Sequence, residues 1–210
     1  MHTLVIDSAT EACSVALFEH DLLIDGAFAM LGRGHAEHLV PMIARLPGKG
    51  RAARIAVALG PGSFTGVRVG LAAARALAFA WDARIVGYPT LALVAAMART
   101  GARAEAGAQP VGVAMTGGHG EWFVESFDAA GRSIRDLASR KPQDAAAHVA
   151  EAVVAGSQAQ ALVDLRGAGR PLAIWPDARA FPALPAEALL GSVAPLYGRA
   201  PDARLPAAIR

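Results

Sequence analysis

The glycine-rich segment of residues 60–66 has a composition that could bind a phosphate group. It stands between a short apolar run and a helix-like stretch, and such a turn can present backbone N–H groups at a helix start. The P-loop pattern requires a lysine that this segment lacks, and Thr65 takes the place of the third glycine in the dinucleotide pattern GxGxxG. We therefore interpret the segment as a structural turn. Its turn residues are Gly60, Gly62, Ser63, Thr65 and Gly66.

Histidines and carboxylates suggest a metal site only weakly. His35 and His38 lie three residues apart on a predicted helix, but no cysteine pair or acidic cluster nearby could complete a zinc site. Asp7 follows the first predicted strand, where enzymes with a ribonuclease H-like sheet keep a metal-binding carboxylate, and Asp82 and Glu121 are possible companions. Nothing fixes the spacing of these three acids. We expect neither a metal site nor a catalytic residue in this chain.

A hydrolytic set could be formed by Ser63, His119 and Glu121. The glycine that the nucleophile elbow GxSxG requires two positions before the serine is missing. The single cysteine, Cys13, is flanked by strand-like residues and is expected to be a small buried side chain. We do not expect hydrolysis.

The elements that must position these residues follow from the apolar periodicity. The first half is predicted to contain strands at residues 4–6, 14–18, 22–30, 55–59 and 85–87 and helices at residues 35–46, 67–81 and 91–99. The second half is predicted to contain strands at residues 111–115, 122–127 and 172–175 and a helix at residues 144–154. Residues 101–109 are rich in glycine and alanine, which predicts a boundary between domains 1–100 and 101–210.

The helix predicted at residues 67–81 is apolar over most of its circumference. Val67, Gly70 and Leu71 belong to one apolar stripe, Val69 and Ala73 belong to another, and Arg68 and Arg75 define the polar line. A helix that covers one face of a sheet needs a single apolar stripe, so this helix has a second surface to bury. That surface is covered either by a partner chain or by the carboxy-terminal half of the same chain.

The composition is that of a folded chain without a membrane span. Hydrophobic residues make up 54% of the sequence and charged residues 18%, which excludes a disordered chain. No apolar run is long enough to cross a bilayer, and no signal peptide is visible, so we expect a cytoplasmic protein. The net charge of +2 is not the dense basic footprint of an autonomous nucleic-acid binder.

Five segments together resemble the TsaB (YeaZ) family in their order and spacing. The resemblance is dense over residues 1–100, and its segments are VIDSATEACSVAL, HAEHLVPMI, ALGPGSFTGVRVGLAAARALA, GYPTLALVA and PLYGR. It implies an α/β fold of two ribonuclease H-like lobes of the actin, Hsp70 and sugar-kinase superfamily, with the second lobe reduced. One departure is the segment of residues 116–118, Thr-Gly-Gly, where many family members have Asp-Ala-Arg.

The resemblance also implies a function in the biosynthesis of threonylcarbamoyladenosine in tRNA. Such a protein performs no chemistry itself but scaffolds and activates the catalytic subunit TsaD, and the ATPase TsaE joins the complex. The complex transfers threonylcarbamoyl to the adenosine next to the anticodon of tRNAs that read ANN codons. The resemblance implies that this chain binds no cofactor, that ATP and a metal ion belong to the partner subunits, and that tRNA is reached through the complex.

The resemblance finally implies a docking surface on the first two helices. They would pack against the equivalent pair of TsaD, or against a second copy as a homodimer when the chain is alone. The predicted interface residues are His38, Leu39, Met42, Ile43, Val69, Ala73 and Ala76. Thr90 and Val94 stand where the catalytic relatives carry a metal-binding HxxxH motif, and neither can hold a metal as imidazole does.

Two alternative functions stay open on the residues alone. The chain could be a stand-alone enzyme of the same superfamily that binds ATP at residues 60–66, with Asp7 near magnesium. It could also be a peptidase-like homologue, active or inactive.

Overall fold

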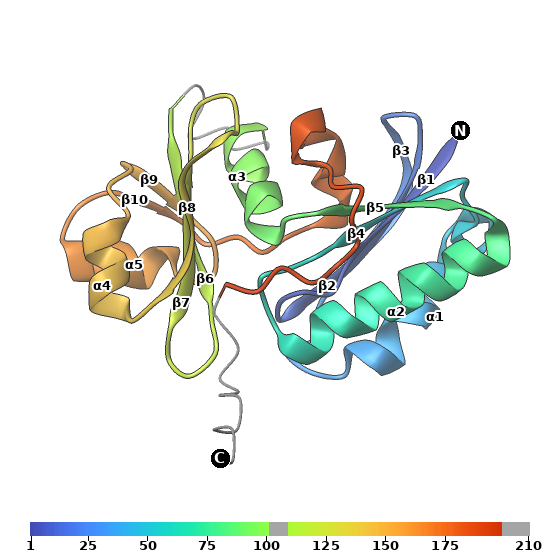
Figure 1. Ribbon diagram of the computed structural model, residues 1–210, viewed down its shortest axis with the longest axis horizontal. Helices are drawn as coiled ribbons and strands as arrows, with labels where there is room; N and C mark the ends of the chain where they lie inside the picture. The colour runs from blue at the N-terminus through green and yellow to red at the C-terminus, as the bar shows by residue number, and fades with distance from the viewer. Residues whose placement is uncertain (101–108, 199–210) are drawn as a thin grey trace, which may run out of the picture.

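The computed structural model describes residues 1–100 and 109–198, and these form two lobes that lie side by side (Figure 1). Each lobe contains a five-stranded mixed sheet, with the orders β3-β2-β1-β4-β5 and β10-β9-β6-β7-β8. The boundary segment predicted at residues 101–109 lies outside the described residues, except for its last residue. The proposed limits of the two domains therefore stay a prediction.

The first sheet begins with a meander and continues with parallel strands. β1 (His2–Asp7), β2 (Ala12–Glu19) and β3 (Leu22–Met30) pair antiparallel through short turns, whereas β4 (Arg54–Ala58) and β5 (Arg84–Tyr88) run parallel to β1. Parallel neighbours need crossover connections, which the helices supply. The carboxyl ends of β1, β4 and β5 therefore share one edge of the sheet.

The helices α1 (His35–Arg45) and α2 (Phe64–Trp81) cover one face of this sheet (Figure 1). A short 3-10 turn (Pro47–Gly50) follows α1, which continues through Pro41 on its exposed side. The opposite face is covered around the 3-10 turn at Ala178–Ala183; after a second 3-10 turn at Ala186–Ala188 the chain pairs with the edge of β5 at Leu190 and reaches α2. Phe181 packs there against Phe18 and Tyr88, with ring centroids 6.4 and 5.6 Å apart. The end of the described chain therefore belongs to the first lobe's packing.

The second sheet is held between two helical layers. Its strands are β6 (Val111–Thr116), β7 (Trp122–Phe127), β8 (Ser133–Arg140), β9 (Val153–Ala155) and β10 (Arg170–Leu172). The helix α3 (Thr90–Thr100) packs on the face toward the first lobe, and α4 (Pro142–His148) and α5 (Ala159–Arg166) cover the outer face. One apolar core extends from β1 of the first lobe to Val113, Phe123 and Phe127 of the second. The two lobes are thus joined by a shared core.

Some expectations for the second lobe need correction. The helix predicted at residues 144–154 ends at His148, because Val153–Ala155 is a fully buried strand between β6 and β10. The strand predicted at residues 172–175 is β10, which runs from Arg170 to Leu172. β8 and α5 were not predicted. The expected reduction of this lobe is not confirmed, since its sheet has as many strands as the first.

No helix in the described parts of the chain has the length and apolar character that a membrane span requires.

Candidate functional site

The turn between β4 and α2 is pressed against the turn between β1 and β2. A Cβ atom on Gly62 would overlap the carbonyl oxygen of Ala9, and one on Gly66 would overlap that of Ser8. The Ser8 hydroxyl donates to the carbonyl of Gly66 at 2.9 Å, and Ser63 caps the helix by accepting from the Gly66 N–H at 3.2 Å. Neither position has room for a side chain, so the close contact of the two turns explains both glycines without a bound ligand.

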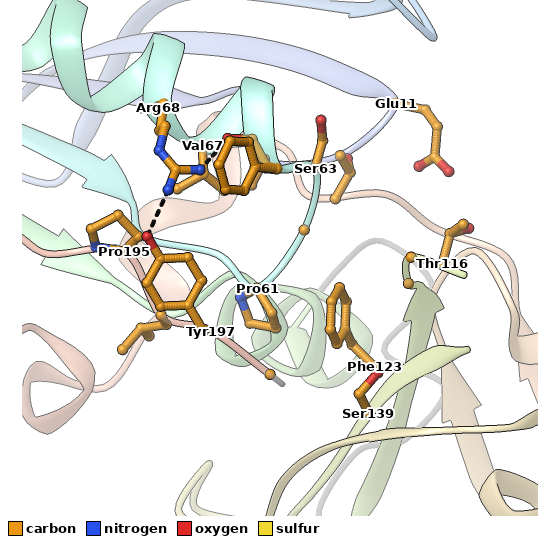
Figure 2. A pocket seen from close by; sticks show the side chains of 18 of the residues that line it. Glu11, Pro61, Ser63, Val67, Arg68, Thr116, Phe123, Ser139, Pro195 and Tyr197 are labelled. Carbon is orange, nitrogen blue, oxygen red and sulfur yellow. Dashed lines mark hydrogen bonds between the residues drawn. The ribbon is translucent and has the colours of Figure 1, made fainter. Parts of the chain in front are cut away.

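A cleft of about 670 Å³ lies where this turn faces the second lobe (Figure 2). Its first wall is formed by the start of α2, the β1–β2 turn and the end of the described chain, and its second wall by the β6–β7 turn with β7 and β8. Phe64, Pro61 and Tyr197 give the first wall an apolar surface, and Phe123 does so for the second. The cleft has the volume and character of a small-molecule site.

Arg68 is the central polar group of the first wall. Its guanidinium lies over the Phe64 ring, 3.2 Å from the centroid, and donates to the Tyr197 hydroxyl at 2.9 Å and to the Phe64 carbonyl at 3.2 Å (Figure 2). Cation–π contact and these two hydrogen bonds hold the charge at the rim of the cleft. No carboxylate pairs with Arg68 among the described residues.

The second wall places fixed polar groups opposite. Thr116 is held by Ser157 and Gln158 through its hydroxyl, at 3.0 Å in each case. Ser139 donates to the Glu121 carboxylate at 2.6 Å, so that carboxylate already has a partner at the cleft. His119 lines the cleft from a turn in which its own φ is positive (57°). This wall offers hydroxyl and imidazole groups to a ligand.

Asp7 does not reach the cleft. Its carboxyl group is enclosed in the core, where it accepts from the Ala9 N–H at 3.1 Å and from the Tyr88 hydroxyl at 3.2 Å. Burial raises the pKa of Asp7 from 3.8 to about 7, and the two hydrogen bonds oppose that rise. A group that resists ionisation and is sealed from solvent is a poor magnesium ligand, so the residues do not fit the Mg-ATP arrangement considered from the sequence.

The other candidate metal and nucleophile residues are not brought together either. His35 is buried against the Ala12 carbonyl at 3.3 Å, whereas the exposed His38 contacts the Gly34 carbonyl at 2.9 Å. Asp82 ends α2, and Glu121 belongs to the second lobe. Within residues 1–100 and 109–198, no three His, Cys, Asp or Glu side chains could hold one metal ion. Cys13 is buried, as expected, and burial raises the pKa of its thiol to about 12.

Ser63 and His119 do line the same cleft, but no hydrogen bond joins them among the described residues. The Ser63 hydroxyl instead caps α2. A nucleophile needs a base within hydrogen-bond reach, and this arrangement does not supply one.

The outward face of α2 is the second candidate site. Phe79 is 92% exposed, and Ala72, Ala76 and Ala80 on the same side of the helix are also exposed. The carboxy-terminal segment contacts α2 at two arginines: Arg68 donates to the Tyr197 hydroxyl, and Arg75 donates to the Val193 carbonyl. These contacts leave the outward face of α2 open. Among the described residues, the chain's own second half therefore covers α2 along Arg68 and Arg75 and leaves the rest of its outward face open. On α1 the neighbouring Val40 is 56% exposed.

The predicted interface residues divide between the core and this surface. Leu39, Met42 and Ile43 are buried in the chain's own core, because α1 turns them toward the sheet, and this corrects their assignment to a docking surface. His38 and Ala76 are exposed, and Val69 and Ala73 are partly buried. Phe79 was not predicted as an interface residue, because it follows Arg75 by four residues and so lies beside the polar line of α2, outside the predicted second stripe. Phe64, Phe123 and Tyr197 of the cleft were also missed, since no local pattern joins them.

Comparison with known proteins gives one family and several relatives. The model of a family described as "TsaD: tRNA N6-adenosine threonylcarbamoyltransferase" matches residues 29–168. The chain is 39% identical over 100 residues to the tRNA threonylcarbamoyladenosine biosynthesis protein TsaB of Escherichia coli K12, covering 45% of this chain and 43% of that protein. It is 33% identical over 104 residues to the TsaB of Bacillus subtilis 168, covering 47% and 45% of the two chains. The matched part thus spans less than half the length of these curated relatives.

Solved structures extend the likeness over nearly the whole fold. YeaZ from Pseudomonas aeruginosa superposes with a TM-score of 0.75 at 27% identity, covering 93% of this chain and 99% of that chain. A second structure, described as an uncharacterized protein with similarity to peptidase YEAZ from Pseudomonas aeruginosa, gives a TM-score of 0.77 at 27% identity. It covers 94% of this chain and 99% of that chain.

Proposed function

The chain belongs to the TsaD family of tRNA N6-adenosine threonylcarbamoyltransferases, and within it to the TsaB (YeaZ) proteins; from this premise we propose that it is a non-catalytic accessory subunit. In this proposal it takes part in threonylcarbamoyladenosine biosynthesis by docking, scaffolding and activating a TsaD-like catalytic subunit. A TsaE-like ATPase joins the complex. ATP and the metal ion are held by the partner subunits, and tRNA is contacted through the assembly.

The observation that carries the proposal is the uncovered apolar face of α1 and α2. Phe79 projects from this face with 92% of its surface exposed, between the exposed Ala72, Ala76 and Ala80 on one side and Arg75 on the other. Exposed apolar patches on folded domains mark interaction surfaces, and small residues allow another helix to approach closely. A homologous catalytic chain, with the equivalent pair of helices, is the partner that this surface fits best.

The accessory role is proposed on where the candidate catalytic residues lie. Thr90 and Val94 are fully buried residues of α3. They stand at the places where the catalytic relatives carry metal-binding histidines. Asp7 is sealed below the cleft and bonded to Tyr88. In the complex, adenosine modification is therefore assigned to the partner's residues, and this chain's contribution is to position them.

The test is co-purification with a TsaD-like subunit together with reconstituted tRNA modification. Ala76→Glu places a charge in the centre of the exposed α2 face, and we expect it to abolish both complex formation and activity. Ala147→Glu is the matched control, because Ala147 is an exposed alanine on α4 of the other lobe. An unchanged complex with Ala76→Glu would refute the docking surface.

The non-catalytic assignment has its own test. We expect Asp7→Asn to keep the reconstituted activity, since the carboxyl group touches no open site. Loss of activity with an intact complex and an intact fold would show that Asp7 takes part in chemistry.

A further inference from the structure

We propose that the cleft between the two lobes binds a small ligand made of a planar aromatic ring and a single anionic group. The proposed docking function uses α1 and the outward face of α2 and leaves this cleft without a role. At about 670 Å³, the cleft lies within the range of pockets that enclose drug-sized molecules.

The walls of the cleft favour a planar ring. Phe123, only 8% exposed, faces the cleft from β7, and Pro61 and Tyr197 stand on the opposite side (Figure 2). Gly198 lies directly against the Phe123 ring, since a Cβ there would come within 2.5 Å of its Cδ1 atom, so the ring is held in place. Fixed aromatic and proline surfaces on two sides suit a flat apolar group, which stacks without disturbing the walls.

The charges favour one anionic group on that ring. The Arg68 guanidinium uses two of its five N–H donors and pairs with no carboxylate among the described residues. It lies in the first turns of α2, where the backbone N–H group of the cleft-lining Phe64 makes no hydrogen bond within the described chain. An anion beside Arg68 would gain charge-assisted hydrogen bonds and the positive end of the helix dipole.

The same charges disfavour a polyphosphate. Among the described residues that line the cleft, Arg68 and His119 are the basic side chains, and Glu11 is acidic. Glu11 lies at the far side of the cleft from Arg68 (Figure 2), where it repels a second negative charge and attracts a hydrogen-bond donor. The polarity of the cleft therefore fixes the orientation of the ligand, with the anion toward Arg68.

The test uses naphthalene-2-sulfonate as the probe and 2-naphthol as its uncharged analogue, titrated calorimetrically into the full chain. We expect the sulfonate to bind. Arg68→Gln should weaken the sulfonate about tenfold or more and change 2-naphthol affinity less than about threefold, because the variant removes a charge-assisted contact and keeps the walls. Circular dichroism and thermal unfolding would verify that the variant is folded.

Arg75→Gln is the matched control. Arg75 lies seven residues further along α2 and also bonds the carboxy-terminal segment, at the Val193 carbonyl, but it does not line the cleft. We expect it to leave sulfonate binding unchanged. The proposal is overturned if the folded wild-type chain does not bind the sulfonate, if both arginine variants weaken it equally, or if 2-naphthol binds as tightly. None of these outcomes bears on docking to a catalytic subunit, which co-purification measures separately.

Discussion

Asp7 ends β1 and is only 1% exposed, and its carboxyl group accepts hydrogen bonds from the Ala9 N–H and the Tyr88 hydroxyl. Burial raises the pKa of Asp7 in the folded chain to about 7, whereas the unfolded chain keeps the ordinary value of 3.8. As pH rises from about 4 to about 7, the unfolded state releases a proton that the folded state retains. The free energy of unfolding should therefore fall across this window and level off above it.

Asp7→Asn should remove this contribution while keeping the local hydrogen bonds. We expect the variant to be more stable than the wild type by up to about 4 kcal/mol at pH 8, and by less than about 1 kcal/mol near pH 4. Urea unfolding at several pH values measures the difference. Burial also raises the pKa of Glu125 to about 7. Glu125 is present in both proteins, so its contribution to the pH dependence cancels in the difference between them. A difference that is constant with pH would contradict a buried, protonated Asp7.

At the scale of elements, the close contact of the 60–66 turn with the β1–β2 turn predicts a strict requirement for glycine. A Cβ on Gly62 would lie 2.8 Å from the Ala9 carbonyl carbon and still closer to its oxygen. Both are backbone atoms, which cannot rotate away, so Gly62→Ala must shift one turn from the other. We expect a loss of about 1–3 kcal/mol or more in the free energy of unfolding, measured by denaturant titration.

Gly118→Ala is the control for this prediction, because a Cβ there would meet nothing within 4 Å. We expect its stability to stay within about 0.5 kcal/mol of the wild type. Equal losses in the two variants would mean that the 60–66 turn has no special steric constraint.

Much of the first lobe follows from local sequence patterns, and much of the second does not. The strand at Leu22–Met30 and the helix from His35 were predicted within a residue because turns and periodicity mark their ends. β8 was missed because Arg135 and Arg140 occupy partly buried positions where the pattern requires apolar residues. The strand at Val153–Ala155 is only three residues long, so it was absorbed into the preceding helix.

The candidate sites divide in the same way. The second apolar stripe of α2 indicated a surface that must be buried, and the exposed Ala76 lies on it, whereas Phe79 lies beside the polar line, one turn after Arg75. The sequence could not decide which face of α1 meets the sheet, since Leu39 and Val40 are both apolar. The cleft was not predictable from local patterns, because its walls join Arg68 to Tyr197, 129 residues away, and to a strand of the other lobe.

At the scale of the whole molecule, the shared core and the carboxy-terminal segment hold the lobes together. Leu190 bridges to Gly87 of β5, and the Leu196 N–H donates to the Leu59 carbonyl at 2.8 Å. The same segment ends at the cleft with Tyr197. These contacts leave the outward face of α1 and α2 open to another chain.

That surface should also support self-association when the chain is alone. In a two-fold dimer with antiparallel α2 helices, Phe79 near one helix end would meet the exposed Thr65 and Ala72 of the other copy's helix, and the contact would occur twice. Sedimentation velocity should show a rise in average mass with concentration for the wild type. Phe79→Glu should remain monomeric, because it would bury two charges against an apolar partner.

Ile134→Glu is the control, since Ile134 is a 55% exposed apolar residue on β8 of the other lobe. It should associate like the wild type. Because the catalytic subunit is proposed to use the same face, adding that subunit should dissociate the homodimer in proportion to the heterodimer formed. Two results would contradict a shared surface. One is a ternary species in which two copies of this chain stay joined while the catalytic subunit is bound. The other is a Phe79→Glu variant that still dimerises.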